Sequence, residues 1–343
     1  MKNTAAKPPI IRLQNVSKRF IKSLDVAAKI AQKLGANIRE EVVHAVDNVS
    51  LSIAQGEVVG LAGESGCGKS TLGRMVAGIL PLSEGTILYK GKDVAQLPPE
   101  EFKQFSLNIQ MIFQDPFASL NPRKRVRNII GNAPLVHGIA KRSELDEYLD
   151  KVMLRCGLDP TFKRRSPHQF SGGQRQRIGI ARALAVNPEF IVCDEAVAAL
   201  DVSIQSQILN LLADLQEQFQ LTYLFIAHDL NVVEHLSDRV AVMYLGKIVE
   251  IAPSIALYKA PLHPYTQALL SAVPIPNPAI QRVGRIILKG DVPSPIDPPP
   301  GCSFHPRCLF ARDVCSKREP EFREIQDKHF VACFFAGQLS LDK

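Results

Sequence analysis

The sequence from residue 58 to residue 70 reads VVGLAGESGCGKS, and this stretch decides the fold. Its last eight residues match the pattern G-x-x-x-x-G-K-S, in which the backbone N–H groups of a glycine-rich turn cradle phosphates. Lys69 neutralises phosphate charge, and Ser70 offers its hydroxyl to Mg²⁺. The apolar run Val58 to Gly63 predicts a buried strand, and Ser70 to Leu80 predicts a helix whose N-terminus faces the anion. The sequence therefore predicts a P-loop that binds a nucleoside triphosphate.

A second glycine-rich helix start follows about a hundred residues later, as FSGGQRQR from Phe170 to Arg177. Ser171 is placed to cap the next helix, and Gly172 and Gly173 let backbone N–H groups approach phosphate oxygens. This motif, after a P-loop, resembles the signature SGGQ of the ATP-binding subunits of ABC transporters. The resemblance covers nearly the whole chain. It implies an α/β P-loop ATPase with a helix-covered parallel sheet, an antiparallel β layer and a helical subdomain at about residues 115–185.

The resemblance assigns catalytic roles to polar residues at the ends of further strands. FIVCDE, from Phe190 to Glu195, is an apolar strand ending in two carboxylates. By resemblance, Asp194 supports Mg²⁺ together with Ser70, and Glu195 polarises the attacking water. Gln114 matches the glutamine that senses Mg²⁺ and water, and His228 matches the histidine that contacts the γ-phosphate and the catalytic Glu. With Lys69, these residues form the predicted catalytic set.

The family pattern also implies which residues contact ATP. Phe20 is placed like the aromatic on which adenine stacks, although an aromatic at a strand end also packs in a core. Asp201 is the predicted cross-dimer residue. The full nucleotide-contacting set is Phe20, Gly63, Glu64, Ser65, Gly66, Cys67, Gly68, Lys69, Ser70, Thr71, Gln114, Ser171, Gly172, Gly173, Gln174, Asp194 and Asp201.

The number of motifs indicates a dimer. In the family, the signature of one copy closes over ATP held by the P-loop of another copy, head to tail. This chain has one P-loop, one signature and no internal repeat. We therefore expect it to pair with itself or with a sister ATPase.

Composition places the chain among folded globular proteins. Of its 343 residues, 46% are apolar and 22% are charged, and the net charge is +7. A positive net charge favours binding to ATP, anionic lipid or nucleic acid, and it does not indicate which of these is the partner. The N-terminus MKNTAAKPP lacks the apolar segment of a secretion signal, and no run approaches the ~18–20 apolar residues that span a bilayer. We expect a peripheral subunit on the cytoplasmic face of the inner membrane, with no nucleic-acid partner.

Four of the seven cysteines cluster near the C-terminus, as Cys302, Cys308, Cys315 and Cys333. Disulfides are disfavoured in a reducing cytosol, so four clustered thiols favour metal ligation. Zinc and a four-iron cluster both accept four thiolates, but the paired C-x₂₋₄-C spacing typical of zinc is absent. Zinc and unligated structural thiols remain alternatives.

A segment before the four C-terminal cysteines indicates which subfamily of ABC transporter ATPases the chain resembles. LHPYTQALL, from Leu262 to Leu270, resembles a segment of the oligopeptide and dipeptide transporter ATPases, whose C-terminal cysteines hold a [4Fe-4S] cluster. His263 and Pro264 themselves read as a helix start. The resemblance implies an ATPase domain at 1–255 and a C-terminal extension at 256–343. Within the extension, proline-rich passages at 273–278 and 292–301 join the cysteine-bearing tail to the core.

The predicted function is ATP hydrolysis that powers peptide import, in complex with two transmembrane permease subunits and an extracytoplasmic solute-binding protein. An importer for nickel or an opine-like solute is an alternative, because substrate choice resides in other subunits. A soluble ABC ATPase that acts on ribosomes or DNA is the alternative from another class. A second cassette or a long coiled-coil insertion would favour it, and the sequence shows neither.

Apolar runs predict the positions of the strands. Ile11 to Val16, Val49 to Ile53 and Gly85 to Lys90 indicate the antiparallel layer. Strands ending at residues 63, 113, 195 and 228 indicate the parallel core. Asp25 to Glu41 reads as a short inserted helix and loop without an assigned function.

Overall fold

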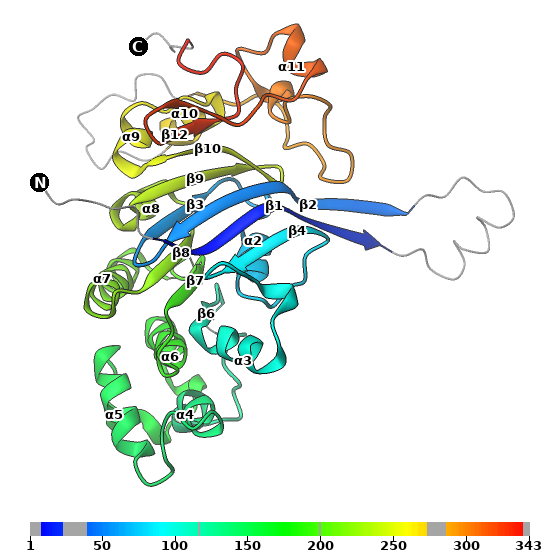
Figure 1. Cartoon of the computed structure of the whole chain (residues 1–343). Helices are drawn as coiled ribbons and strands as arrows, with labels where there is room; N and C mark the ends of the chain where they lie inside the picture. Colours follow the sequence, from blue (N-terminus) through cyan, green and yellow to red (C-terminus); the bar gives the residue numbers. More distant parts are fainter. Residues whose placement is uncertain (1–7, 23–39, 116, 199, 273–285, 339–343) are drawn as a thin grey trace, which may run out of the picture.

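The computed structural model describes residues 8–22, 40–115, 117–198, 200–272 and 286–338. Two sheets occupy the middle of the molecule (Figure 1). The smaller sheet is antiparallel, with strand order β2-β1-β4-β5. Its strands are β1 (Pro9–Lys22), β2 (Glu41–Ala54), β4 (Glu84–Tyr89) and β5 (Lys92–Asp93).

The larger sheet has eight strands in the order β11-β12-β10-β9-β3-β8-β7-β6. The pairs from β9 to β6 are parallel, and β10, β12 and β11 continue the sheet antiparallel. Its strands are β3 (Val58–Ala62), β6 (Ile109–Ile112), β7 (Phe190–Asp194), β8 (Thr222–Ile226), β9 (Arg239–Tyr244), β10 (Lys247–Pro253), β11 (Arg323–Gln326) and β12 (His329–Val331).

Helices cover the parallel part of this sheet. Every residue of β3, β7 and β8 is buried, which is why these strands are continuous apolar runs instead of alternating ones. The α-helices of the whole described chain, including those outside this layer, are α2 (Lys69–Val76), α3 (Pro99–Asn108), α4 (Val126–Val136), α5 (Leu145–Arg155), α6 (Gly172–Leu184), α7 (Val202–Phe219), α8 (Leu230–Leu236), α9 (Ser254–Lys259), α10 (Pro264–Ser271) and α11 (Asp313–Lys317).

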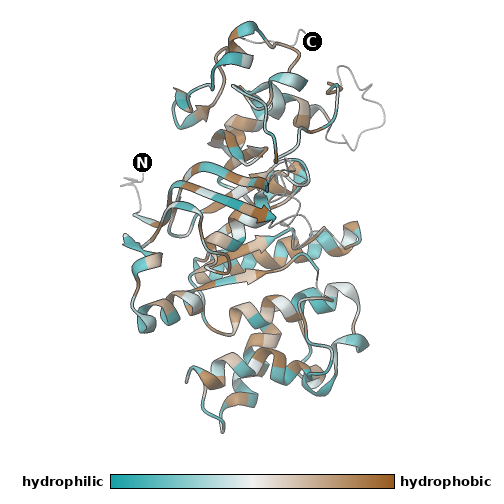
Figure 2. Cartoon of the chain, turned by 90° about the vertical axis from the view of Figure 1, so that its right-hand side faces the viewer, coloured by the Kyte–Doolittle hydropathy of each residue, from teal (hydrophilic) through white to brown (hydrophobic). Residues whose placement is uncertain are grey.

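Helices α4, α5 and α6 form a body at one end of the molecule (Figure 1). They pack against one another, and α6 also contacts α7 and β6. In Figure 2 each of these helices carries both hydrophobic and hydrophilic segments. This pattern is expected for amphipathic helices that bury one face. The helices occupy the region of the predicted helical subdomain.

The predicted P-loop ATPase fold is confirmed, with both sheets placed as expected. Several boundaries differ: α2 ends at Val76, not at Leu80, and the strands predicted at 11–16 and 49–53 are longer, at Pro9–Lys22 and Glu41–Ala54. Gly78 has a φ of +69°, a left-handed conformation that ends a helix at little cost in glycine. The predicted insertion at 25–41 lies largely outside the described residues, and its last residue, Glu41, begins β2.

The C-terminal region joins the core sheet. β12 pairs with β10, which pairs with β9 beside the P-loop strand β3. The second proline-rich passage also contacts the core, because the amide of His44 donates to the carbonyl oxygen of Pro295 at 2.9 Å. A separate cysteine-rich domain is therefore not confirmed. A division of the chain at residue 255 remains a prediction.

Candidate nucleotide site

The P-loop connects β3 to α2, and its shape depends on glycine. Gly68 caps α2 in a left-handed conformation with a φ of 106°. A Cβ atom there would lie 2.1 Å from the carbonyl oxygen of Ala45 on β2, so a side chain does not fit. The Lys69 ammonium donates to the carbonyl oxygens of Gly63 at 2.8 Å and Glu64 at 2.9 Å. The buried lysine therefore points back over the loop, where a phosphate binds in P-loop proteins.

Four further predicted residues gather with Ser70 at the carboxyl ends of parallel strands. The Ser70 hydroxyl donates to Asp194 Oδ1 at 2.6 Å. Gln114 Nε2 donates to Glu195 Oε2 at 2.6 Å, and His228 Nδ1 lies 3.7 Å from the same oxygen. Burial raises the pKa of Asp194, an effect that its hydrogen bond from Ser70 opposes. The structure thus brings the predicted catalytic residues together from β6, β7, β8 and α2.

The donor set of this cluster suits magnesium. Mg²⁺ prefers hard oxygen ligands and usually keeps several waters while it contacts one or two protein groups and substrate phosphates. Ser70 offers a hydroxyl oxygen and Asp194 a carboxylate oxygen at the start of α2. Gln114 donates its amide N–H to Glu195, and the same amide carries a carbonyl oxygen, a hard ligand. These residues fit the ion that the P-loop pattern implies.

Phe20 lies on β1, where its side chain is 41% exposed and the Lys18 ammonium sits 5.3 Å from the ring centroid. It is in register with Val43 of β2, two positions before Ala45, whose carbonyl oxygen faces Gly68. An exposed aromatic next to a P-loop can stack on a base. Its role as the adenine platform stays a prediction.

The signature motif begins α6. The Ser171 hydroxyl accepts from the Gln174 amide at 3.3 Å, and the Gln174 side chain accepts from the Ser171 amide at 3.2 Å. This capping box confirms the predicted cap. A Cβ atom on Gly173 would lie 2.5 Å from Ile204 of α7, a helix that is preceded by Asp201. The signature and Asp201 therefore lie on neighbouring elements, whereas the P-loop helix α2 packs against β7 and β8.

Two contacts to the P-loop were not predicted. The Tyr265 hydroxyl accepts from the backbone amide of Glu64 at 2.8 Å. Arg307 donates from both terminal nitrogens to the Glu64 carboxylate, at 2.7 and 3.0 Å. Tyr265 lies in the LHPYTQALL segment, whose sequence resembles a family segment but does not indicate a role for the tyrosine. Nothing in the sequence marks Arg307 except its place between Cys302 and Cys308.

The four C-terminal cysteines line one small cavity, together with aromatic and proline residues. Within the described part of the chain, no group of three or more His, Cys, Asp or Glu residues has the geometry to hold a metal ion. The predicted metal site is therefore not confirmed. His263, beside this cavity, caps α10 by accepting from the Tyr265 amide at 3.1 Å, which confirms the predicted helix start.

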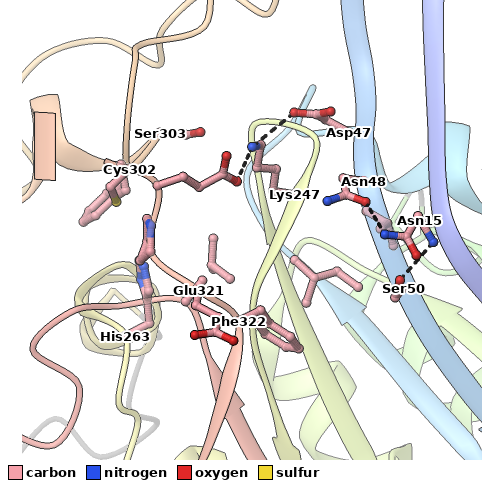
Figure 3. Close-up of a pocket in the computed structure, with 17 residues that line it drawn as sticks. Asn15, Asp47, Asn48, Ser50, Lys247, His263, Cys302, Ser303, Glu321 and Phe322 are labelled. Atoms are coloured by element: carbon pink, nitrogen blue, oxygen red, sulfur yellow. Dashed lines mark hydrogen bonds and ion pairs between the residues drawn. The ribbon is translucent and has the colours of Figure 1, made fainter. Parts of the chain in front are cut away.

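A surface pocket of about 510 Å³ separates the antiparallel sheet from the C-terminal region (Figure 3). Lys247 bridges Asp47, at 3.2 Å, and Glu319 across it. Asn15 and Asn48 lie on one side, and Cys302 lies on the other (Figure 3). The lining includes no residue of the P-loop, so this pocket is not the nucleotide site.

Comparison with known proteins agrees with this geometry. Residues 46–198 match the ABC transporter family, and residues 249–315 match the C-terminal region of the oligopeptide/dipeptide transporter family. The oligopeptide transport ATP-binding protein AppF of Bacillus subtilis is 51% identical over 332 residues, covering 96% of this chain and 98% of AppF. The chain belongs to the ABC transporter ATP-binding subunits of the oligopeptide/dipeptide importer family.

Other members and solved structures support the same placement. The oligopeptide transport ATP-binding protein OppF of Haemophilus influenzae is 50% identical over 297 residues, covering 86% of this chain and 90% of OppF. A dimeric ATP-binding cassette in a post-hydrolysis state, bound to ADP and Pi, superposes with a TM-score of 0.60 at 28% identity, covering 71% of this chain and 98% of that one. The structure of cbiO1 from Clostridium perfringens superposes with a TM-score of 0.60 at 25% identity, covering 74% of this chain and 92% of cbiO1. None of the helices described in this structure is long and apolar enough to cross a membrane.

Proposed function

We propose that this protein is the ATP-hydrolysing subunit that powers import of oligopeptides or dipeptides through an ABC transporter. The observation that carries the proposal is the placement of Glu195 between Gln114 and His228, directly after Asp194, which accepts a hydrogen bond from Ser70 of the P-loop. Family membership supports the transported class, because relatives at about half identity are named oligopeptide transport ATP-binding proteins.

Phosphoryl transfer needs little covalent help from a protein, so the rate depends on positioning and charge stabilisation. The backbone amides of residues 66–70 cradle the phosphates, and the Lys69 ammonium turns from its carbonyl acceptors to phosphate oxygens. Glu195 accepts a hydrogen bond from the attacking water, and Gln114 and His228 hold its carboxylate in place. Ser70, Asp194 and Gln114 would hold Mg²⁺, and the ion would supply neutralisation of phosphate charge.

The arrangement of the signature supports a head-to-tail dimer. Ser171 to Gln174 open α6 beside Asp201, while the P-loop opens α2. In the dimer, the signature of one subunit covers ATP on the P-loop of the other, whether that is a second copy or a sister ATPase. Two transmembrane permeases and an extracytoplasmic binding protein complete the importer. The subunit then lies peripherally on the cytoplasmic face of the membrane.

We further propose that the four cysteines that line the C-terminal cavity would hold a [4Fe-4S] cluster. Their donor set fits, since four thiolates are the usual ligands of such a cluster. One zinc ion would draw all four sulfurs to about 2.3 Å from a single point, a closer arrangement. The cluster would supply structural cross-linking of the C-terminal region. Anaerobic purification followed by iron, sulfide and zinc analysis distinguishes a [4Fe-4S] cluster from a zinc ion. Protein that contains zinc but no iron or sulfide would contradict the cluster proposal.

Peptide uptake tests the function directly. Cells that lack the gene are supplied with the wild type, with Glu195→Gln, or with Glu147→Gln as a control at an exposed surface pair. Uptake of a labelled tripeptide is restored by the wild type and by the control and is lost with Glu195→Gln. Unchanged peptide uptake in the deletion strain, with loss of nickel or opine uptake, would contradict the assignment of substrate class.

A further inference from the structure

Glu64, the first variable residue of the P-loop, has partners at all of its polar atoms. Its amide donates to Tyr265, and its carboxylate accepts both terminal nitrogens of Arg307. Its carbonyl oxygen accepts from Lys69, the residue that binds phosphate in P-loop proteins. One P-loop residue therefore connects the phosphate-binding lysine to two side chains of the C-terminal region, about two hundred residues away in the sequence.

The ion pair between Arg307 and Glu64 is well placed to hold the loop. The Arg307 side chain is 8% exposed and the Glu64 side chain 27%, so water screens the pair only partly. A bidentate arginine fixes the orientation of a carboxylate as well as its position, and its charge-assisted bonds are stronger than neutral ones. Arginine is charged at every physiological pH, and the hydrogen bonds to Glu64 raise the pKa of Arg307 further.

Arg307 is itself held by the turn that carries the cysteines. It ends a short 3₁₀ helix, His305–Arg307, directly before Cys308. The amide of His305 donates to the Cys302 carbonyl at 2.9 Å. Next to this turn, Phe304 packs edge-on against Tyr244 at 5.2 Å between ring centroids. The guanidinium is thus presented to the P-loop from a hydrogen-bonded turn that packs on the core through the buried Phe304.

We propose that Arg307 is a positioning residue of the ATP site: by pairing with Glu64 it holds the P-loop in its phosphate-binding conformation. This inference rests on the proposed ATPase function. It makes nucleotide affinity depend on the C-terminal region, in addition to the P-loop residues themselves. A disturbance of the cysteine-bearing turn then weakens ATP binding through Arg307, without contact between the cysteines and the nucleotide.

A purely structural tie would behave differently. Loss of a tie lowers the melting temperature of the nucleotide-free protein and leaves the affinity for ATP unchanged. Loss of a positioning contact raises the dissociation constant and the KM for ATP, while kcat at saturating ATP is retained. Lys247 provides the matched control, because it also links the core to the C-terminal region through Glu319, is 24% exposed, and does not line the P-loop.

The experiment measures binding of MgATP by calorimetry to the full chain, in a Glu195→Gln background in which hydrolysis is slow. Arg307→Gln and Glu64→Gln each weaken binding by about ten-fold, the effect of one or two charge-assisted hydrogen bonds. The double variant is no weaker than either single variant, because both remove the same contact. Lys247→Gln stays within about two-fold of the parent. In protein that keeps the wild-type Glu195 and hydrolyses ATP, Arg307→Gln and Glu64→Gln each raise the KM for ATP by the same factor of about ten.

ATP binding could weaken because the contact between Arg307 and Glu64 is lost or because the C-terminal metal site is lost. Iron content, measured for every variant, distinguishes these two causes. Glu64→Gln leaves the C-terminal turn intact, so its effect cannot come from a lost metal site. If Arg307→Gln weakens binding while Glu64→Gln does not, or if both keep the parental affinity, the inference is wrong. If the wild-type chain hydrolyses no ATP, the proposed function has failed instead.

Discussion

Replacing Glu250 by glutamine tests how the C-terminal region is attached to the core. Glu250 lies on β10 and is fully buried. Its Oε1 accepts from the Leu262 amide and from His329 Nε2, both at 2.7 Å, and its Oε2 accepts from the His263 amide at 3.1 Å. One carboxylate thus joins β10 to the start of α10 and to β12.

Glutamine keeps one acceptor but turns an N–H group toward the His263 amide, and it removes the charge that strengthens all three bonds. Hydrogen bonds to a charged group contribute about 1.5–3 kcal/mol each, and an unsatisfied buried donor costs about 1–3 kcal/mol. Breaking a buried charged contact typically costs about 3–5 kcal/mol, so we expect a loss of that size in the free energy of unfolding. The melting temperature should fall by roughly 5–10 °C.

Thermal unfolding followed by circular dichroism measures this loss. Glu147→Gln is the matched control: the same chemical change at an exposed pair with Lys151, expected to alter stability by less than about 0.5 kcal/mol. A melting temperature of Glu250→Gln within about one degree of the wild type would refute the reasoning, because three buried contacts would then contribute almost nothing.

Three further outcomes are expected from single sites. Gly68→Ala should reduce MgATP binding below detection by calorimetry, because its Cβ would lie 2.1 Å from the Ala45 carbonyl oxygen at a φ of +106°; detectable binding near wild-type affinity would contradict this. Burial raises the pKa of Cys156 to about 12, so iodoacetamide at pH 8 should modify it only in denaturant, as mass spectrometry of tryptic peptides can show. Gln114→Ala should slow ATP turnover by at least about ten-fold, because Glu195 loses its 2.6 Å donor; an unchanged kcat would exclude this role.

The core of the fold was predictable because its signals are local. The strand before the P-loop is an uninterrupted apolar run, since β3 is buried on both faces, and the glycines after it mark the phosphate turn. The roles of the residues that follow β7 and β8 came from the resemblance to the ABC transporter ATPases, and the structure brings these residues together. Ser171 was predicted as a cap from its position before two glycines, and its hydroxyl does accept from Gln174.

The attachment of the C-terminal region could not be predicted in the same way. β12, His329–Val331, is three residues long, and the β11 strand Arg323–Gln326 is mostly exposed and polar, so neither carries a strand pattern. The pairing of Arg307 with Glu64 joins positions 243 apart, and arginine at position 307 is one of 41 basic residues in the chain. Such contacts depend on tertiary packing, which a single sequence does not encode locally.

Phosphate release by the assembled importer at saturating MgATP tests the central claim most directly, with wild-type protein compared with Glu195→Gln. The account predicts that the variant binds ATP normally but hydrolyses it about 10²–10⁴-fold more slowly, the usual contribution of a positioned carboxylate base. Hydrolysis by Glu195→Gln at a rate within a few-fold of the wild type would contradict the assignment of Glu195, and with it the proposed mechanism.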